Sequence, residues 1–331
     1  MVERKGHALW IAGEHFLGIS GSYPGLATQR VHEHDDGMRP GDPARRMEDM
    51  DRDDIYASIV YGPGALWGFP MEDPELKLAV LRAWNDWSAE EFNAHLPGRL
   101  CALAALPTLS PAVAIEELQR CLALGHRGFV FRAHDLDLVD LGRNWDDLWS
   151  ALEEADVPIS FHIGGGTALA VDGTTENYLE AGWKVPASVA VLPLQLDEPF
   201  SVMMYCGALE KHPGLKLVLA ESGVGWIPYL VKRMDATFEK HCKPARDGMI
   251  NTRPSEIFQR QVFATFEEEP FGPQLIPLLG PDNFMWACDY PHPDSTWPES
   301  RKAIDEALGS LSDETVRKVT GETCKRLYKL D

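Results

Sequence analysis

The chain has no segment that resembles a membrane span or a signal peptide. It contains no run of eighteen apolar residues and no short apolar stretch behind a basic N-terminus. Basic residues are scarce, with 31 Lys and Arg against 51 Asp and Glu and a net charge of −20. Nucleic acids and anionic membranes both require a basic patch on their partner, so the composition argues against either one.

Paired cysteine motifs and sequence repeats are also missing. The six cysteines include no CxxC pair, and several lie in apolar runs. This pattern indicates reduced core thiols in the cytoplasm, while the even count leaves disulfides open. With 44% hydrophobic residues and ten Trp there is ample material for a core. We therefore expect one large ordered domain rather than a disordered chain.

Short apolar runs alternate with longer amphipathic stretches, which is typical of repeated βα units. Each run is continuous, as expected of parallel strands that are covered on both faces. The predicted strands are residues 57–63, 99–107, 128–133, 158–164, 215–222, 261–268 and 283–290. The predicted helices are residues 74–96, 110–125, 145–157, 225–242 and 312–330.

Seven such strands are one short of a closed α/β barrel of the TIM (β/α)₈ type. The missing strand should precede residue 57, where residues 7–20 have the pattern of a small β-hairpin and a polar loop follows. We therefore predict an N-terminal hairpin and loop over residues 1–42 and a barrel domain over 43–331. This strand is either absent from the chain or degenerate, and a truncated gene start or a fragment is the simplest explanation for its absence.

Ionisable residues end several of the predicted strands. His162 ends the fourth, Glu221 the fifth, Glu267 to Glu269 the sixth and Asp289 the seventh, with His292 three residues later. Barrel chemistry is built at the carboxyl ends of the strands, and imidazole with carboxylate suits zinc, iron or manganese. The competing interpretations are a buried structural histidine at 162 and, at 221, a carboxylate that accepts backbone N–H groups from the turn SGVG.

Two other segments are expected to be loops rather than parts of the strands or helices. His32 and His34 form a His-x-His pair, but no apolar strand surrounds them, so we expect a solvated loop. Residues 165–200 are long and rich in Gly, Ala and Pro, and we expect a mobile loop over the barrel mouth that sets specificity.

The segments PISFHIG, HPGLKLVLAESGVGWIPYLVKRMD and MWACDYPHPDSTWP together resemble the amidohydrolase-2 family of the amidohydrolase superfamily. The resemblance implies a metal-dependent TIM-barrel enzyme, with His162 and Asp289 as metal ligands. Two positions depart from the family pattern. The first-strand His-x-His pair has no counterpart, and Glu221 stands where the family's decarboxylases carry a catalytic histidine.

The combination of ESGVGWIP and DYPHPDSTWP is similar to a subgroup that contains a TIM-barrel non-haem diiron monooxygenase of diterpenoid biosynthesis. Such a site needs more carboxylates than a single zinc does, and Glu221, Glu268 and His292 would supply additional ligands. In that interpretation the substrate is CoA-linked.

We therefore predict a metal-dependent enzyme that hydrolyses or decarboxylates a carboxylated or acyl-linked small molecule, with one or two divalent ions. His162 and Asp289 are the predicted ligands, and Asp289 is alternatively a base. Glu221 is a second-metal ligand or base, and His292 a ligand or proton shuttle. The alternatives are the diiron oxygenase and a non-catalytic barrel that has lost its metal. The resemblance also implies a possible homo-oligomer.

Overall fold

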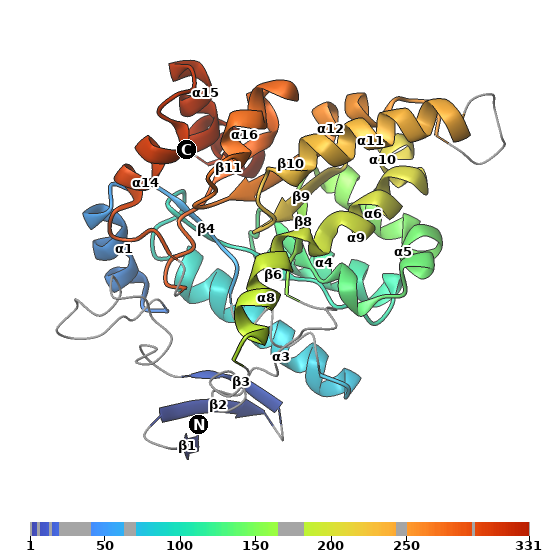
Figure 1. Ribbon diagram of the computed structural model, residues 1–331. Helices are drawn as coiled ribbons and strands as arrows, with labels where there is room; N and C mark the ends of the chain where they lie inside the picture. Colours follow the sequence, from blue (N-terminus) through green and yellow to red (C-terminus); the bar gives the residue numbers. More distant parts are fainter. Residues whose placement is uncertain are drawn as a thin grey trace.

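The computed structural model of the protein is shown in Figure 1 and describes residues 2–4, 7–12, 15–19, 41–62, 71–164, 182–242, 250–292 and 295–330. Its central strands all run parallel. They are β4 (Ser58–Val60), β5 (Leu100–Ala102), β6 (Ala104–Ala105), β7 (Phe129–Phe131), β8 (Pro158–His162), β9 (Lys216–Ala220), β10 (Val262–Phe266) and β11 (Phe284–Trp286).

Helices connect these strands and cover their outer side (Figure 1). The longer ones are α1 (Pro43–Arg52), α3 (Pro74–Trp87), α4 (Pro111–Ala123), α5 (Leu138–Asn144), α6 (Asp146–Ala155), α8 (Lys184–Val191), α9 (Asp197–Tyr205), α11 (Trp226–His241), α12 (Pro254–Gln261) and α14 (Ser300–Leu308). The shorter ones are α10 (Ala208–Lys211), α13 (Gly272–Leu275), α15 (Asp313–Arg317) and α16 (Thr323–Tyr328). Within the described residues no helix is both long and apolar enough to cross a lipid bilayer.

The predicted N-terminal hairpin is present. Strands β2 (His7–Ala12) and β3 (His15–Ile19) pair antiparallel, and β1 (Val2–Arg4) adds a third strand beside β2. The pair His32 and His34 lies outside the described residues. From Lys184 onward, the segment expected to be a mobile loop is helical instead, since it forms α8, a 3₁₀ turn over Leu192–Leu196 and the start of α9.

Three helices begin with the same local signal. Asp42, Asp73 and Ser110 each precede a Pro, and each side chain accepts hydrogen bonds from backbone N–H groups of the first helical turn. Proline lacks the N–H that would be unsatisfied there, and a cap of this kind stabilises a helix by about 1 kcal/mol. These short signals define where α1, α3 and α4 start.

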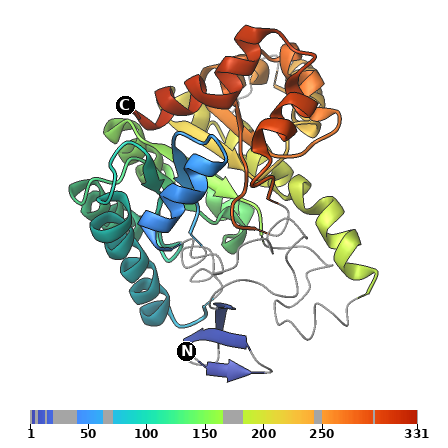
Figure 2. The ribbon, with the colours of Figure 1, turned by 90° about the vertical axis from the view of Figure 1, so that its left-hand side faces the viewer.

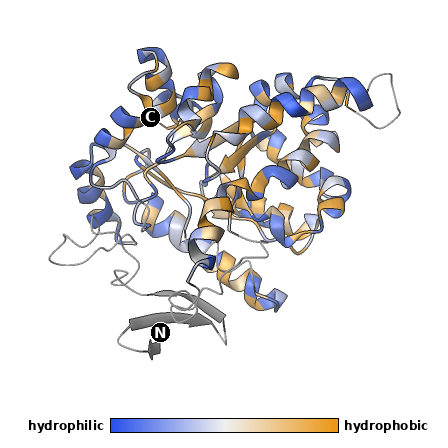
Figure 3. Cartoon of the chain, viewed as in Figure 1, coloured by the Kyte–Doolittle hydropathy of each residue, from blue (hydrophilic) through white to orange (hydrophobic). Residues whose placement is uncertain are grey.

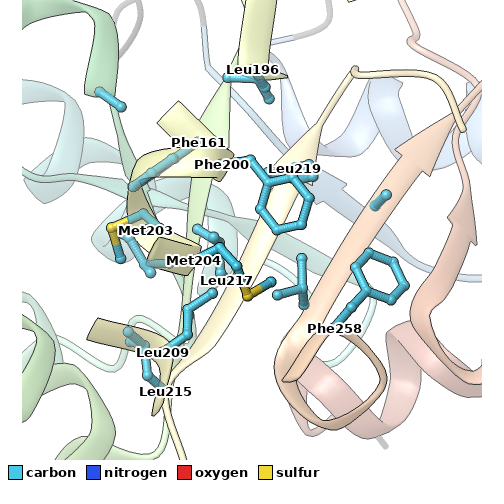
Figure 4. Packing of buried hydrophobic residues seen from close by; sticks show 14 of the residues in the cluster. Phe161, Leu196, Phe200, Met203, Met204, Leu209, Leu215, Leu217, Leu219 and Phe258 are labelled. Atoms are coloured by element: carbon cyan, nitrogen blue, oxygen red, sulfur yellow. The ribbon is translucent and has the colours of Figure 1, made fainter. Parts of the chain in front are cut away.

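The main hydrophobic core lies between the strands and the helical layer. Figure 3 shows hydrophobic residues on the strands and on the inner sides of the helices, with hydrophilic residues on the outer sides. Figure 4 shows part of this core, in which Phe200 and Met204 of α9 pack with Leu217 and Leu219 of β9. Burial of these side chains explains why α9 is helical, since one face of this helix is buried.

A second, smaller core fills the barrel interior. Val218, Phe263 and Met285 point inward from neighbouring strands, and Leu327 and Tyr328 of α16 close the amino-terminal end. Alternate residues of β8 follow the same rule, because the Ser160 hydroxyl lies 2.9 Å from the Tyr61 hydroxyl. Because strand residues alternate, these inward-facing side chains show which other residues of the same strands also face the barrel interior.

The ring of strands is open on one side. Sheet pairing runs from β6 to β11 in sequence order, while β4 pairs with β5, and no pairing between β4 and β11 occurs in the described part of the chain. Buried Arg46 of α1 bridges this side, since its Nη2 donates to Ser58 Oγ and to the Tyr290 carbonyl at 3.3 and 3.4 Å. Figure 2 shows α1 beside the C-terminal helices, in agreement with the hydrogen bond from Trp297 Nε1 to the Asp49 carbonyl.

The predicted strand 99–107 is interrupted at Leu103. Beyond this residue α3 replaces a neighbouring strand, because Trp84 Nε1 donates to the Leu103 carbonyl and the Asn85 amide bonds both the N–H and the carbonyl of Ala105. Two side chains thus satisfy a strand edge that would otherwise lack partners.

Asn85 also contacts Glu117, a fully buried carboxylate of α4. Glu117 accepts hydrogen bonds from Asn85 Nδ2 at 2.7 Å, Arg82 Nε at 2.9 Å and Arg120 Nη2 at 2.7 Å. Burial alone would raise the pKa of Glu117, but the contacts with Arg120, Asn85 and Arg82 outweigh it and lower this pKa. The ionised form of Glu117 is therefore the one that stabilises the fold.

We expect Glu117→Gln to destabilise the protein by about 2 kcal/mol at pH 7, because both arginines lose a charged acceptor. A lowered folded-state pKa means that the stabilisation is present above the unfolded value and is lost as the pH falls through the folded value. The difference should therefore shrink in acid. Urea unfolding at pH 7 and at decreasing pH measures it. The matched control is Glu116→Gln on the same helix, an exposed partner of Arg82, with an expected effect below about 0.5 kcal/mol. Equal losses in both variants would contradict the prediction.

Candidate functional site

Four ionisable side chains meet at the carboxyl edge of the barrel. His162 is the last residue of β8, Glu221 directly follows β9, Glu267 directly follows β10 and Asp289 comes three residues after β11. Because parallel strands end at the same edge, these positions converge. One carboxylate oxygen each from Glu221, Glu267 and Asp289 lies within 4.8 Å of the other two.

Two of these residues have a strained backbone. Glu221 and Asp289 have φ values of 56° and 53°, in the left-handed region that side chains with a Cβ rarely adopt. The strain costs about 1–2 kcal/mol per residue. Local hydrogen bonds support it, since the Glu221 N–H donates to Thr265 Oγ1 at 2.7 Å and the His292 N–H donates to the Asp289 carbonyl at 2.7 Å. Strain of this kind, held by its surroundings, is typical of functional sites.

His162 is buried, and both of its ring nitrogens have partners. Nδ1 lies 2.6 Å from the Ile163 carbonyl, which requires a proton on Nδ1, and Nε2 lies 2.9 Å from Glu221 Oε2. Burial alone would lower the pKa of His162, but the hydrogen bond and charge of Glu221 outweigh it and raise this pKa. Burial would likewise raise the pKa of Glu221, and the contact with His162 lowers it instead. The two shifts favour the charged form of both His162 and Glu221.

Asp289 differs from Glu221 in its environment. Its Oδ2 is buried without a hydrogen-bond partner among the described residues, and Nδ1 of the exposed His292 lies 3.1 Å from it. Burial raises the pKa of Asp289, the contact with His292 opposes the shift and the charge of Glu221 adds to it. Asp289 therefore retains a proton more readily than an ordinary aspartate.

The arrangement fits a divalent cation. Three carboxylates converge, and within the described residues the basic groups in contact with them are His162 and the exposed His292, so the carboxylates outnumber them. The unsatisfied Oδ2 of Asp289 is an oxygen that a cation would satisfy. Carboxylate oxygens with one imidazole are suitable ligands for manganese, iron or zinc. The fixed proton on His162 Nδ1 leaves Nε2 as the nitrogen for a metal, as in many metal-binding histidines.

The structure brings together four of the five predicted site residues, namely His162, Glu221, Asp289 and His292. The fifth, Glu268, is exposed. Its neighbour Glu267 is instead the residue whose carboxylate converges with those of Glu221 and Asp289. Thr265 and Glu267 share the inward side of β10, so the alternation of strand residues is the signal that distinguishes 267 from 268.

Glu269 fills the structural role considered for Glu221. Its two oxygens accept the N–H groups of Val224 and Gly225 at 2.7 and 2.8 Å, just ahead of α11. Any side chain at Gly225 would collide with this carboxylate, because a Cβ there would lie 2.5 Å from Glu269 Oε1. The turn SGVG is thus held by Glu269, and Glu221 remains available to the site.

A parallel barrel with imidazole and carboxylates at its carboxyl edge defines a metal-dependent TIM-barrel enzyme. The amidohydrolase family profile (Amidohydro_2) matches residues 11–330, and the chain belongs to this family. Membership confirms the predicted barrel and the predicted class of metal-dependent enzyme. The finer resemblance to the diiron monooxygenase remains a prediction.

Several relatives and solved structures are similar to the chain. Gamma-resorcylate decarboxylase of Rhodococcus jostii (strain RHA1) is 27% identical over 313 residues, which cover 86% of this chain and 87% of the relative. The structure of 5-carboxyvanillate decarboxylase from Sphingomonas paucimobilis has a TM-score of 0.70 at 22% identity and covers 86% of this chain and 82% of its own. Dihydroxybenzoic acid decarboxylase from Polaromonas sp. JS666, solved with bound manganese and 2-nitroresorcinol, has a TM-score of 0.69 at 21% identity, with coverages of 86% and 85%.

Proposed function

We propose that the protein is a divalent-metal-dependent decarboxylase that acts on a carboxylated aromatic acid. The observation that carries the proposal is the convergence of Glu221, Glu267 and Asp289 beside His162 at the barrel edge. The relatives named above, which are decarboxylases of hydroxylated benzoates, support the reaction class, and the manganese in the Polaromonas structure supports the kind of metal.

Decarboxylation breaks the bond between the ring carbon and the carboxylate, releases CO₂ and forms a new C–H bond with one proton. Asp289 is the residue suited to deliver that proton, because burial and the charge of Glu221 raise its pKa and its buried Oδ2 has no hydrogen-bond partner among the described residues. His162, Glu221 and Glu267 would hold the metal, with Asp289 beside it as the acid. When bound, the metal supplies positive charge that orients the substrate carboxylate and stabilises negative charge developing in the transition state.

The remaining residues fix the acid and the ligands in place. Thr265 holds the Glu221 backbone, and the Ile163 carbonyl fixes the His162 tautomer. His292, exposed and beside Asp289, is positioned to return a proton to Asp289 from solvent after turnover. Each turnover then consumes one proton and releases one CO₂.

The test is metal analysis of the purified protein followed by a CO₂-release assay. We expect manganese or zinc to be retained, and CO₂ to be released from at least one of 2,6-dihydroxybenzoate and 5-carboxyvanillate, with none released after chelation. Two irons per chain together with oxygen uptake would favour the diiron oxygenase instead. Absence of metal binding and of turnover on carboxylated aromatics would contradict the proposal.

A further inference from the structure

A second charged cluster lies at the ends of β6 and β7. It does not include the three converging carboxylates of Glu221, Glu267 and Asp289. Lys77 Nζ of α3 donates to Thr108 Oγ1 at 2.9 Å and to Asp135 Oδ2 at 3.0 Å. Arg132 Nε lies 3.0 Å from the other oxygen of Asp135. The side chains of Lys77, Arg132 and Asp135 are only 8%, 18% and 15% exposed. Both cations thus contact the same carboxylate, at the ends of two neighbouring strands.

The register of the sheet places Arg132 at the barrel mouth. Phe131 pairs with Phe161, so the next residues, Arg132 and His162, lie side by side at the ends of neighbouring strands. The Phe131 ring packs on Trp145 in the helical layer and therefore faces outward. Because successive strand residues alternate, Arg132 faces inward, as His162 does.

His134, two residues after Arg132 in the chain, also has a ring nitrogen without a partner. Its Nε2 is buried and has no hydrogen-bond partner among the described residues. Burial lowers the pKa of His134, and the charge of Arg132 adds to the shift, so the imidazole is neutral at pH 7. A buried ring nitrogen without a partner is costly unless a bound molecule satisfies it.

The carboxylates and the cations lie at the ends of different strands around the barrel mouth. Carboxylates stand at the ends of β9, β10 and β11, whereas the cations stand at β7 and α3, with His162 of β8 between them. A guanidinium presents parallel N–H donors that match a carboxylate, and partial burial strengthens such a contact. The cluster is thus suited to an anionic group on a molecule that also reaches the carboxylates.

We propose that Arg132, supported by Lys77 through Asp135, binds a second anionic group of the substrate, distinct from the carboxylate that reacts. The inference rests on the proposed function and deepens it, since it makes the substrate an aromatic acid with two anionic groups. Arg132 then determines specificity, and Asp135 and Lys77 are positioning residues.

The test compares the binding of benzoate and isophthalate, which differ by one carboxylate, to the manganese-loaded protein by isothermal titration. We expect isophthalate to bind at least about tenfold more tightly than benzoate, as a charged hydrogen bond allows. Arg132→Gln should remove this preference, and Arg132→Lys should retain part of it. The matched control is Arg317→Gln, which removes an exposed ion-paired arginine of α15 and should leave the preference intact.

Each outcome bears on one claim. An isophthalate preference that survives in a folded Arg132→Gln variant, as checked by thermal unfolding, would overturn the assignment of Arg132, and so would a wild-type protein without any preference. A preference that depends on Arg132, in a protein that releases no CO₂ from any carboxylated aromatic, would refute the proposed function while the anion site stands. Decarboxylation that is unaffected by Arg132→Gln on dianionic substrates would refute the anion site alone.

Discussion

Asp289→Asn should reduce decarboxylation by at least about 10³-fold while the protein remains folded. The amide has the shape of the carboxylate but carries no negative charge for a metal and no acidic proton for the ring carbon. Loss of a metal's charge stabilisation is worth several kcal/mol, which corresponds to a factor of this size. The backbone strain at Asp289 is unaffected, because Asn tolerates the left-handed conformation.

The measurement combines CO₂ release with the manganese content of the variant. The matched control is Asp282→Asn at the other end of the same strand, where an exposed carboxylate pairs with Lys318. A variant that keeps manganese but not activity identifies Asp289 as the proton donor, and one that loses both identifies it as an essential ligand. Unchanged activity and metal content would remove Asp289 from the site.

The strands were predictable because barrel strands are covered on both faces. The run 158–164 contains β8 at Pro158–His162, and the run 283–290 contains β11, since continuous apolar segments bounded by turns have few other conformations. Helix α11 at Trp226–His241 likewise follows its amphipathic pattern over 225–242. Strand-end residues such as His162 and Asp289 followed from these runs together with the rule for barrel chemistry.

What could not be predicted depends on contacts between distant residues. The break at Leu103 arises from Trp84 and Asn85, and nothing local to residues 99–107 indicates it. The helical character of α9 arises from burial of side chains such as Phe200, Met203 and Met204. The choice between Glu267 and Glu268 depends on which side of β10 faces inward, and this is set by its register with β9 and β11.

The position of Arg132 illustrates the same limit. A lone arginine after an apolar run carries no clear signal in the sequence, because arginines follow many strands. Only the pairing of Phe131 with Phe161 places it beside His162, and only the fold brings Lys77 to Asp135. Charge complementarity across the mouth is therefore a property of the assembled barrel.

Glu221→Gln should lower turnover by about 10²-fold or more and weaken manganese binding. The variant keeps the length of the side chain but removes one of three converging negative charges and the charged acceptor of His162. Electrostatic groups of this kind each contribute about 10²–10³ in rate. The sequence resemblance implies a histidine at the position of Glu221 in decarboxylases of the family, so the variant tests whether this chain uses the carboxylate.

Two further glutamates on one loop provide the comparison. Glu267→Gln should weaken manganese binding in the same direction as Glu221→Gln, because both side chains belong to the converging group, whereas Glu268→Gln should change turnover less than about twofold. Kinetics and metal titration on the three variants give the order of effects. If Glu268→Gln were as damaging as Glu267→Gln, the inward register of β10 would be wrong. A fully active Glu221→Gln variant would show that the strained carboxylate serves the fold rather than the chemistry. A bound cation would then no longer explain why carboxylates converge at the barrel edge.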